Sequence, residues 1–191
     1  MRNDTNKAIV KKGRPRSESS RRAILDATLS LTEEYGSVKK VTVDTIAKRA
    51  GVGKQTIYKW WESTSDILLE ILREVAGNEI DSASRDTDLT TFLHNTFQAL
   101  KPPVVLIMKS LMAESVLDVS LRKKFIDQFI LSRRIVLKKI LEQSSGLIME
   151  DQSLLTDFIF GLIWYRLLVM DVSSLDDSEG EKIAKLLMGK S

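Results

Sequence analysis

The segment from residue 42 to residue 61, TVDTIAKRAGVGKQTIYKWW, constrains the fold of this chain more than any other stretch. Thr42 is a favourable helix N-cap, and Ile46 and Ala47 follow at positions that share one apolar helix face. Gly51 stands where that helix must end, because glycine accepts the left-handed conformation common at helix ends. The pattern predicts two short helices joined by a tight glycine turn.

The second of these helices, which begins after Gly53, brings lysine, glutamine, threonine and tyrosine side chains close together. Ile57 and Trp61 lie four residues apart and share its apolar face, so we expect Trp61 in the core. Such a helix is narrow enough to enter the major groove of DNA, which makes the segment a candidate helix-turn-helix. A plain helical hairpin in a core has the same apolar spacing, so the flanking residues have to separate the two interpretations.

Charge is distributed unevenly along the chain. The first 63 residues hold 14 Lys and Arg against 7 Asp and Glu, a net charge of +7. The remaining residues hold 15 against 19, a net charge of −4, so the overall +3 conceals a basic amino-terminal third. A polyanionic partner for that third explains the asymmetry, whereas a merely solvated charged surface does not require it.

A basic run, KKGRPR, occupies residues 11–16. Proline favours an extended backbone and disfavours helix at the residue before it, so we predict a flexible basic arm over residues 1–16. Arg14 and Arg16 would then lie in the DNA minor groove, where arginine is attracted to narrow A·T tracts. The alternative is a disordered tail that only aids solubility. A scaffold helix capped by a serine of the 17–20 segment and ending near Gly36 would follow.

Beyond residue 63, apolar residues recur at helical spacing, and no run alternates convincingly at period two as a half-buried strand would. Six helices are expected there, at residues 64–80, 89–100, 104–116, 120–143, 151–170 and 179–188. We therefore predict an all-α protein of about nine helices. A three-helix DNA-binding domain would cover residues 17–63, and a helical ligand-binding and dimerisation body would cover residues 64–191.

The helix expected over residues 151–170 is apolar on more than one face, and such a helix must be covered on several sides. In a small bundle at the end of the chain, a second subunit is the natural cover, although burial within one subunit would also satisfy it. The small Gly161 would permit close approach of helices. The expected dimer contact consists of Phe158, Gly161, Leu162, Tyr165 and Leu168. A two-fold dimer would present two reading helices one DNA turn apart.

Two stretches of this sequence, ILDATLSLTEEYG and TVDTIAKRAGVGKQTIYKWWES, resemble the amino-terminal domain of the TetR/AcrR family of transcriptional regulators. The resemblance covers about residues 20–75, and the run DFIFGLIWYRLLVM is more weakly similar to the end of several members. It implies a homodimer held by an intersubunit four-helix bundle, and a small-molecule pocket between the middle helices of the body. Gly53 stands where the reading helix often begins with serine, and Thr64 stands where a phosphate-contacting lysine is common.

The chemistry of the side chains predicts their roles on DNA. Lys54 and Gln55 lie in the first turn of the reading helix, the end that points at base edges, where lysine suits guanine and glutamine suits adenine. Thr56 suits a phosphate or a thymine methyl, and phosphate contacts would come from the residues around it and from the preceding helix. The candidate DNA-binding residues are Arg14, Arg16, Thr42, Lys48, Lys54, Gln55, Thr56, Tyr58, Lys59 and Trp60.

The composition does not favour an enzyme. The chain has no cysteine and one histidine, His94, on an amphipathic segment where a structural role is more common than a catalytic one. The sequence holds no phosphate-binding glycine loop, nucleophile elbow or metal-spaced ligand cluster, so we expect no catalytic residue, metal or cofactor. The longest apolar run, residues 158–165, is too short to span a bilayer, and the start is polar. We expect a cytoplasmic protein that makes no membrane contact.

The expected function is that of a transcriptional repressor, released from a near-palindromic double-stranded DNA operator by an unknown small-molecule effector. Candidate pocket residues, of types that more often form plain core, are Phe97, Met108, Met112, Phe129, Arg133 and Trp164. Arg133 or Arg134 would meet an anionic ligand or else lie on a solvated face. Two alternatives stay open: a DNA-binding regulator controlled by a protein partner, and an architectural DNA-binding protein that responds to no ligand.

Overall fold

A computed structural model describes residues 14–82, 88–144, 151–170 and 177–187 of the chain. Within these residues the fold is entirely helical and contains no strand, as predicted. The amino-terminal domain consists of α1 (Arg14–Tyr35), the short 3-10 helix η1 (Val38–Lys40), α2 (Val43–Ala50) and α3 (Lys54–Tyr58). The body consists of α4 (Thr64–Ser82), α5 (Leu89–Ala99), α6 (Val104–Leu117), α7 (Val119–Phe125), the π turn η2 (Ile126–Ile130), α8 (Leu131–Gln143), α9 (Gln152–Leu168) and α10 (Asp177–Leu187).

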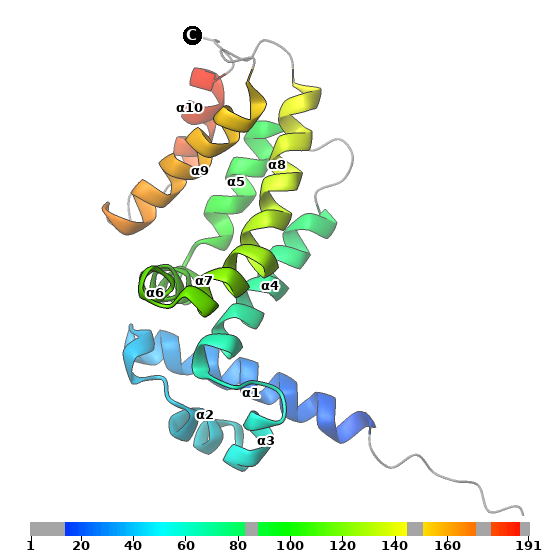
Figure 1. Cartoon of the computed structure of the whole chain (residues 1–191), viewed down its shortest axis with the longest axis vertical. Helices are drawn as coiled ribbons and strands as arrows, with labels where there is room; N and C mark the ends of the chain where they lie inside the picture. Colours follow the sequence, from blue (N-terminus) through cyan, green and yellow to red (C-terminus); the bar gives the residue numbers. More distant parts are fainter. Residues whose placement is uncertain (1–13, 83–87, 145–150, 171–176, 188–191) are drawn as a thin grey trace, which may run out of the picture.

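The two parts are stacked along the long axis of the molecule (Figure 1). Helices α1, α2 and α3 form the lower end, and α4 leads from them into the body. Helix α8 packs against α4, α5 and α9, while α10 packs against α5 at the upper end. Helices α7, η2 and α8 follow one another without a break and form one continuous rod, called here the α7–α8 rod. Counted in this way, and with the three-residue η1 left out, the described residues hold nine helices, which agrees with the predicted number.

The helix-turn-helix forms because its capping residues lie where the sequence predicts them. The Thr42 hydroxyl accepts a hydrogen bond from the Thr45 backbone N–H at 3.3 Å, and the Thr45 hydroxyl accepts one from the Thr42 N–H at 2.9 Å. Gly51 has a φ of 66°, in the left-handed region, and ends α2. Gly53 caps α3 with an extended backbone and contributes no side-chain hydrogen bond.

Trp61 closes the core of the amino-terminal domain. Its side chain is 4% exposed, as predicted, and lies in the same core as buried Ile57. The indole N–H donates to the carboxylate of Glu70 on α4, and Glu70 also pairs with Arg21 of α1. One carboxylate therefore joins α1 and α4 to the end of residues 54–61, called here the reading segment.

The predicted boundary between the basic arm and the first helix is wrong. Helix α1 begins at Arg14, earlier than the predicted serine cap, so Arg14 and Arg16 belong to its first turn. Pro15 is compatible with this position because the first turn of a helix does not use its backbone N–H groups. Residues 1–13 of the predicted arm lie outside the described residues.

The single long helix predicted over residues 120–143 contains a π turn. Helix α7 ends at Phe125 and α8 begins at Leu131, with the five residues of η2 between them. Four residues of α-helix advance about 400°, so a strict four-residue repeat moves ~40° around the helix at each step. The wider π turn compensates for this rotation and keeps the residues of the repeat on the side that faces the core. The buried residues that make the four-residue repeat are Leu121, Phe125, Phe129, Arg133, Leu137 and Leu141.

The remaining predicted helix ends differ from the observed ones by one or two residues, which is the usual scatter at fraying termini. Helix α4, for example, continues to Ser82, and α10 begins at Asp177. The gaps between the predicted helices at residues 81–88 and 144–150 lie largely at residues 83–87 and 145–150, outside the described residues.

Charged side chains join α6 and α7 to the beginning of α4. Lys124 of α7 donates to Asp66 at 2.8 Å, and Ser65 donates to Glu114 of α6 at 2.9 Å. Ser63 and Asp66 also cap α4 reciprocally, with bonds of 3.1 Å and 3.2 Å. Burial alone would raise the pKa of Asp66, but the hydrogen bonds from Lys124 and Ser63 outweigh it and hold that pKa below its usual 3.8.

We expect Asp66→Asn to destabilise the folded state at neutral pH by about 1 kcal/mol, because the charge-assisted hydrogen bond from Lys124 is lost. A carboxyl whose pKa is lower in the folded than in the unfolded chain stabilises the fold above its unfolded pKa. That contribution disappears as the pH falls through the folded pKa. The deficit in unfolding free energy should therefore be constant near neutral pH and shrink below pH 3.8.

Urea unfolding at several pH values measures this deficit. Asp127→Asn is the control, because Asp127 pairs with Lys123 on an exposed surface and its loss should matter little at any pH. A deficit of equal size at pH 7 and at pH 2 would contradict the assigned role of Asp66.

Candidate nucleic-acid interface and ligand cavity

The reading segment presents its polar side chains to solvent and its apolar ones to the core. Ile57 is buried and Thr56 half-buried. An exposed polar face backed by an apolar one is what a helix that enters a DNA groove requires. The predicted DNA-binding residues exposed on α3 and directly after it are Lys54, Gln55, Tyr58, Lys59 and Trp60.

Lys54 has a partner inside the helix-turn-helix. Its ammonium pairs with the carboxylate of Asp44 in the first turn of α2. The hydrogen bond to Asp44 raises the pKa of Lys54 above its usual 10.5, and both side chains stay exposed. A contact between Lys54 and a base would therefore compete with this ion pair. Asp44 was not among the predicted site residues, although an acidic residue in the first turn of a helix was a visible signal.

The other predicted contacts lie on α2 and at the start of α1. The Thr42 hydroxyl accepts the capping bond of α2 and lies 3.3 Å from the Thr45 hydroxyl, where either oxygen can be the donor, so a bond from Thr42 to a phosphate would compete with this contact. Lys48 is exposed on the same helix. Arg14 and Arg16 lie in the first turn of α1, so their backbone is helical instead of extended.

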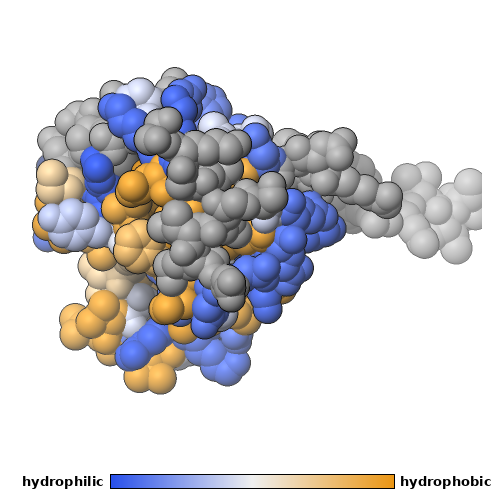
Figure 2. All heavy atoms as spheres, turned by 90° about the horizontal axis from the view of Figure 1, so that it is seen from above, coloured by the Kyte–Doolittle hydropathy of each residue, from blue (hydrophilic) through white to orange (hydrophobic). Residues whose placement is uncertain are grey.

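A second predicted surface runs along the outer face of α9. Leu162 is half-buried there, and the other members are exposed, Phe158 by 54%. Spacings of three and four residues keep the set on one helix face. Figure 2 shows apolar atoms gathered on the side where Figure 1 places α9. The α9 stripe consists of Leu154, Phe158, Gly161, Leu162, Tyr165 and Leu168; Leu154, four residues before Phe158, was missed in the sequence.

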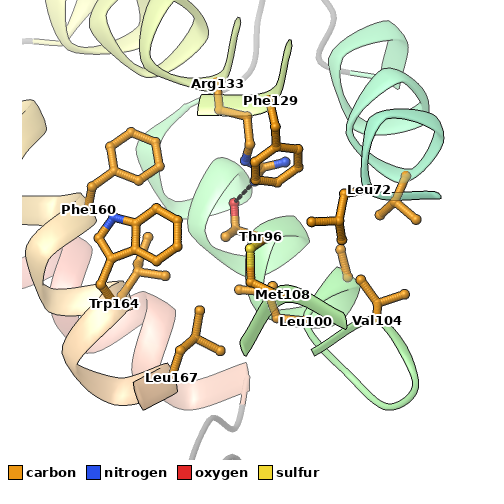
Figure 3. A pocket seen from close by; sticks show the side chains of 13 residues that line it. Leu72, Thr96, Leu100, Val104, Met108, Phe129, Arg133, Phe160, Trp164 and Leu167 are labelled. Atoms are coloured by element: carbon orange, nitrogen blue, oxygen red, sulfur yellow. Dashed lines mark hydrogen bonds between the residues drawn. The ribbon is translucent and has the colours of Figure 1, made fainter. Parts of the chain in front are cut away.

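A small apolar cavity lies inside the body, between residues of α4, α5, α6, the α7–α8 rod and α9 (Figure 3). Its volume is about 30 Å³, room for one or two water molecules. Phe97 and Met112 were predicted to line it and do not: Phe97 lies beside Gly180 of α10, and Met112 is half-buried against the core. Four predicted residues do line it, namely Met108, Phe129, Arg133 and Trp164.

Arg133 brings a positive charge to this cavity. Its side chain is 7% exposed, which excludes the solvated face considered from the sequence. Nη2 donates to the Thr96 hydroxyl at 2.9 Å, and the guanidinium carbon lies 5.9 Å and 5.6 Å from the ring centroids of Phe92 and Phe129. Thr96 was not among the predicted pocket residues, although a threonine among the apolar residues of α5 was a visible signal. A few polar groups in an apolar wall are typical of sites for small molecules.

Among the side chains that the structure describes, no group of three or more His, Cys, Asp and Glu is placed to hold a metal ion. None of the helices, as far as they are described, is long and apolar enough to cross a membrane. His94 lies exposed on α5 and is not among the residues that line the cavity.

We expect Lys59→Ala to weaken binding to all DNA sequences, because an exposed lysine after the reading helix is placed to contact a phosphate. Its loss should lower the slope of log affinity against log salt by about one unit. Lys139→Ala is the matched control, because Lys139 is also exposed but lies on α8. Titration of labelled DNA at several salt concentrations gives both slopes, and an unchanged slope for Lys59→Ala would remove its phosphate contact.

Family models match both parts of the chain. The model described as "Bacterial regulatory proteins, tetR family" matches residues 24–71, which include the helix-turn-helix. The model described as "Tetracyclin repressor-like, C-terminal domain" matches residues 79–187, more than half of the chain.

Individual proteins agree with these models. The uncharacterized HTH-type transcriptional regulator YdeS of Bacillus subtilis (strain 168) is 35% identical over 166 residues, which are 83% of this chain and 83% of that protein. The structure of FadR from Bacillus subtilis in complex with stearoyl-CoA shares the fold, with a TM-score of 0.69 at 23% identity over 89% of this chain and 98% of that chain. FadR from Bacillus halodurans has a TM-score of 0.69 at 21% identity, over 94% and 97% of the two chains. The identity to YdeS and the extent of the model matches establish that this chain belongs to the TetR family of DNA-binding transcriptional regulators.

Proposed function

We propose that this regulator is a homodimeric repressor that binds a near-palindromic operator and leaves it when a small molecule occupies the cavity of the body. Residues up to 63 would read the DNA, and residues 64–191 would bind the ligand and the second subunit. One observation carries the proposal: α4 and the α7–α8 rod both line the cavity, and both also contact the amino-terminal domain, α4 through Glu70 and Trp61, and the rod through Lys124, which donates to Glu62 at 3.4 Å.

The path between the two sites follows these two elements. Leu72 of α4 and Arg133 of the rod line the cavity. Closer to the DNA-binding end, Asp66 of α4 and Lys124 of the rod are joined by their hydrogen bond. Glu70, one turn after Asp66, holds the indole of Trp61 at the end of the reading segment. A displacement at the cavity therefore reaches the reading helix through contacts that are all present in one chain.

The size of the cavity supports a mechanism in which the ligand moves helices. A pocket for a small organic ligand typically measures roughly 300 Å³ or more, about ten times the present volume. Binding would therefore separate the helices that line the cavity. The ligand needs only a higher affinity for the widened body than for the closed one, and that difference is the free energy that shifts the reading helices. In this proposal the closed body is the form that binds DNA.

The α9 stripe supports the dimer. An exposed line of Phe158, Tyr165 and Leu168 on a helix of a small bundle is the kind of surface that a second copy covers. Two copies of α9 and α10 would form a four-helix bundle across a two-fold axis. The two α3 helices would then contact half-sites whose centres lie ~34–36 Å apart, which is one turn of DNA.

A small-molecule effector is further supported by one relative of the same fold, since the FadR structure from Bacillus subtilis holds stearoyl-CoA. A regulator that binds the chromosome of a cell without a nucleus would act in the cytoplasm, which is where we place it.

Control by a protein partner is the second candidate, and a separate surface favours it. Val116, Leu117 and Val119, at the turn between α6 and α7, are 69%, 89% and 73% exposed. A protein that covered this turn would press on the start of the α7–α8 rod and so act on the same path through Lys124.

Footprinting of the purified protein on genomic fragments that it selects tests the proposal, together with expression of a reporter placed under the protected promoter. We expect two protected half-sites about one helical turn apart and higher reporter expression when the regulator is deleted. Lower expression on deletion would identify an activator instead.

We expect Gly161→Leu to convert the dimer into a monomer and to lower operator affinity at least tenfold, because one half-site supplies too few contacts. A Cβ added at Gly161 meets no other atom of the chain within 4 Å, so the fold of the single chain should tolerate the change. Gly77→Leu is the matched control, because Gly77 of α4 is open in the same sense. Sedimentation velocity and operator titration compare the two variants. A Gly161→Leu protein that stays dimeric would place the two-fold contact elsewhere.

A further inference from the structure

We infer that Asp44 and Lys54 together read one G·C base pair of the half-site, with Lys54 bound to guanine and Asp44 bound to cytosine. The inference goes beyond the proposed function, because it needs neither the effector nor the second subunit. It rests on the membership of a DNA-binding family and on the ion pair between these two side chains on the exposed face of the helix-turn-helix.

The position of the carboxylate is the first argument. Asp44 is the one acidic residue in the sequence from residue 42 to residue 61, which holds four basic residues. Its side chain is 67% exposed and contacts the ammonium of Lys54, whose side chain is 58% exposed. The pair joins the first turn of α2 to the first turn of α3, at the lower end of the molecule (Figure 1). Because the first turn of a reading helix points at base edges, this carboxylate lies where DNA must approach.

The electrostatic effect of Asp44 is the second argument. The phosphates of DNA repel a carboxylate at this place, and the ion pair withholds part of the charge of Lys54 from them. This cost is offset only where a base offers a hydrogen-bond donor to the carboxylate. Asp44 therefore weakens binding to most sequences more than binding to a matching one, which is how a repulsive group creates specificity.

The pattern of groups in the major groove is the third argument. Guanine presents two acceptors there, N7 and O6, and its partner cytosine presents the N4 amino donor beside them. Lysine suits the two guanine acceptors, and aspartate suits the cytosine amino group. An A·T pair also offers a donor, adenine N6, but this group lies between two acceptors, so a carboxylate there also meets the O4 oxygen of thymine. The G·C pair is thus the better match to a cation and an anion held side by side.

Both side chains can bind the base pair without losing each other. An ammonium has three N–H donors, and a carboxylate has two oxygens with several acceptor positions. Lys54 can therefore donate to Asp44 and to guanine, while Asp44 accepts from Lys54 and from cytosine. The competition between a base and the ion pair is consequently smallest on a G·C pair.

Selection of bound duplexes from a pool of random double-stranded DNA, followed by sequencing, tests the assignment with the full-length protein. Asp44→Ala removes the carboxylate, and Lys54→Gln removes the ammonium. We expect the wild type to select a G·C pair whose preference over A·T falls about fivefold or more in each variant, at the same position. The double variant should lose no more of this preference than Lys54→Gln alone, because both side chains read one base pair.

Titration of a selected duplex and of a random duplex separates reading from simple repulsion. We expect Asp44→Ala to bind the random duplex about threefold more tightly or better, with a salt slope steeper by up to about one unit, because Lys54 is then available to a phosphate. The ratio between the two affinities should fall. Asp127→Ala is the matched control, because it removes an exposed carboxylate that pairs with Lys123 in the body, and it should change neither affinity.

Unchanged base preferences in the Asp44→Ala protein would overturn the inference. If its affinity for all duplexes rose equally, Asp44 would be a repulsive charge only, and if only its melting temperature fell, Asp44 would be a helix-stabilising charge only. Loss of preference at an A·T pair, or at different positions in the two variants, would overturn the inference as well. A wild-type protein that no small molecule releases from DNA contradicts the proposed function and leaves this inference in place.

Discussion

The rest of the structure depends on the burial of α4 on nearly all of its sides. Consecutive positions point in different directions around a helix, so no single packing face can cover them. The first turns of α4 are held by the amino-terminal core through Glu70, and the later turns line the cavity with Leu72 and Val75. A helix that belongs to two cores cannot shift in one without disturbing the other. The residues of α4 that are at most 2% exposed are Ile67, Leu68, Leu69, Ile71 and Leu72.

The α7–α8 rod repeats this arrangement from the other side of the junction. Lys124 bonds the first turn of α4, and Arg133, further along the same rod, bonds Thr96 beside the cavity. The π turn η2 lies between the two. Such turns are frequent at functional sites, and here the wider backbone allows one rod to hold a polar contact near the DNA-binding domain and a buried charge in the body. Together α4 and the rod give the proposed effector two routes to the reading helix.

Much of the amino-terminal domain could be predicted because its structure depends on residues close together in the chain. The cap at Thr42 and the stop at Gly51 each involve groups within about four positions, and local spacing also placed Trp61 in the core. The start of α1 could not be predicted in this way. Pro15 fits both an extended arm and a first helical turn, so its local preference does not distinguish them.

The sequence by itself therefore determined the helical class, the reading segment and the apolar stripe of α9, since each is a periodic pattern carried by one helix. The tertiary structure decided the cavity, because its wall is assembled from helices distant in the sequence. Phe97 and Met112 have the same chemistry as Phe129 and Met108, yet only the latter pair lines the cavity. Whether an apolar side chain fills a core or faces a gap is set by the separation of neighbouring helices, and no local pattern encodes that separation. The same is true of Arg133, which is buried where Thr96 and Phe92 of α5 pack against it.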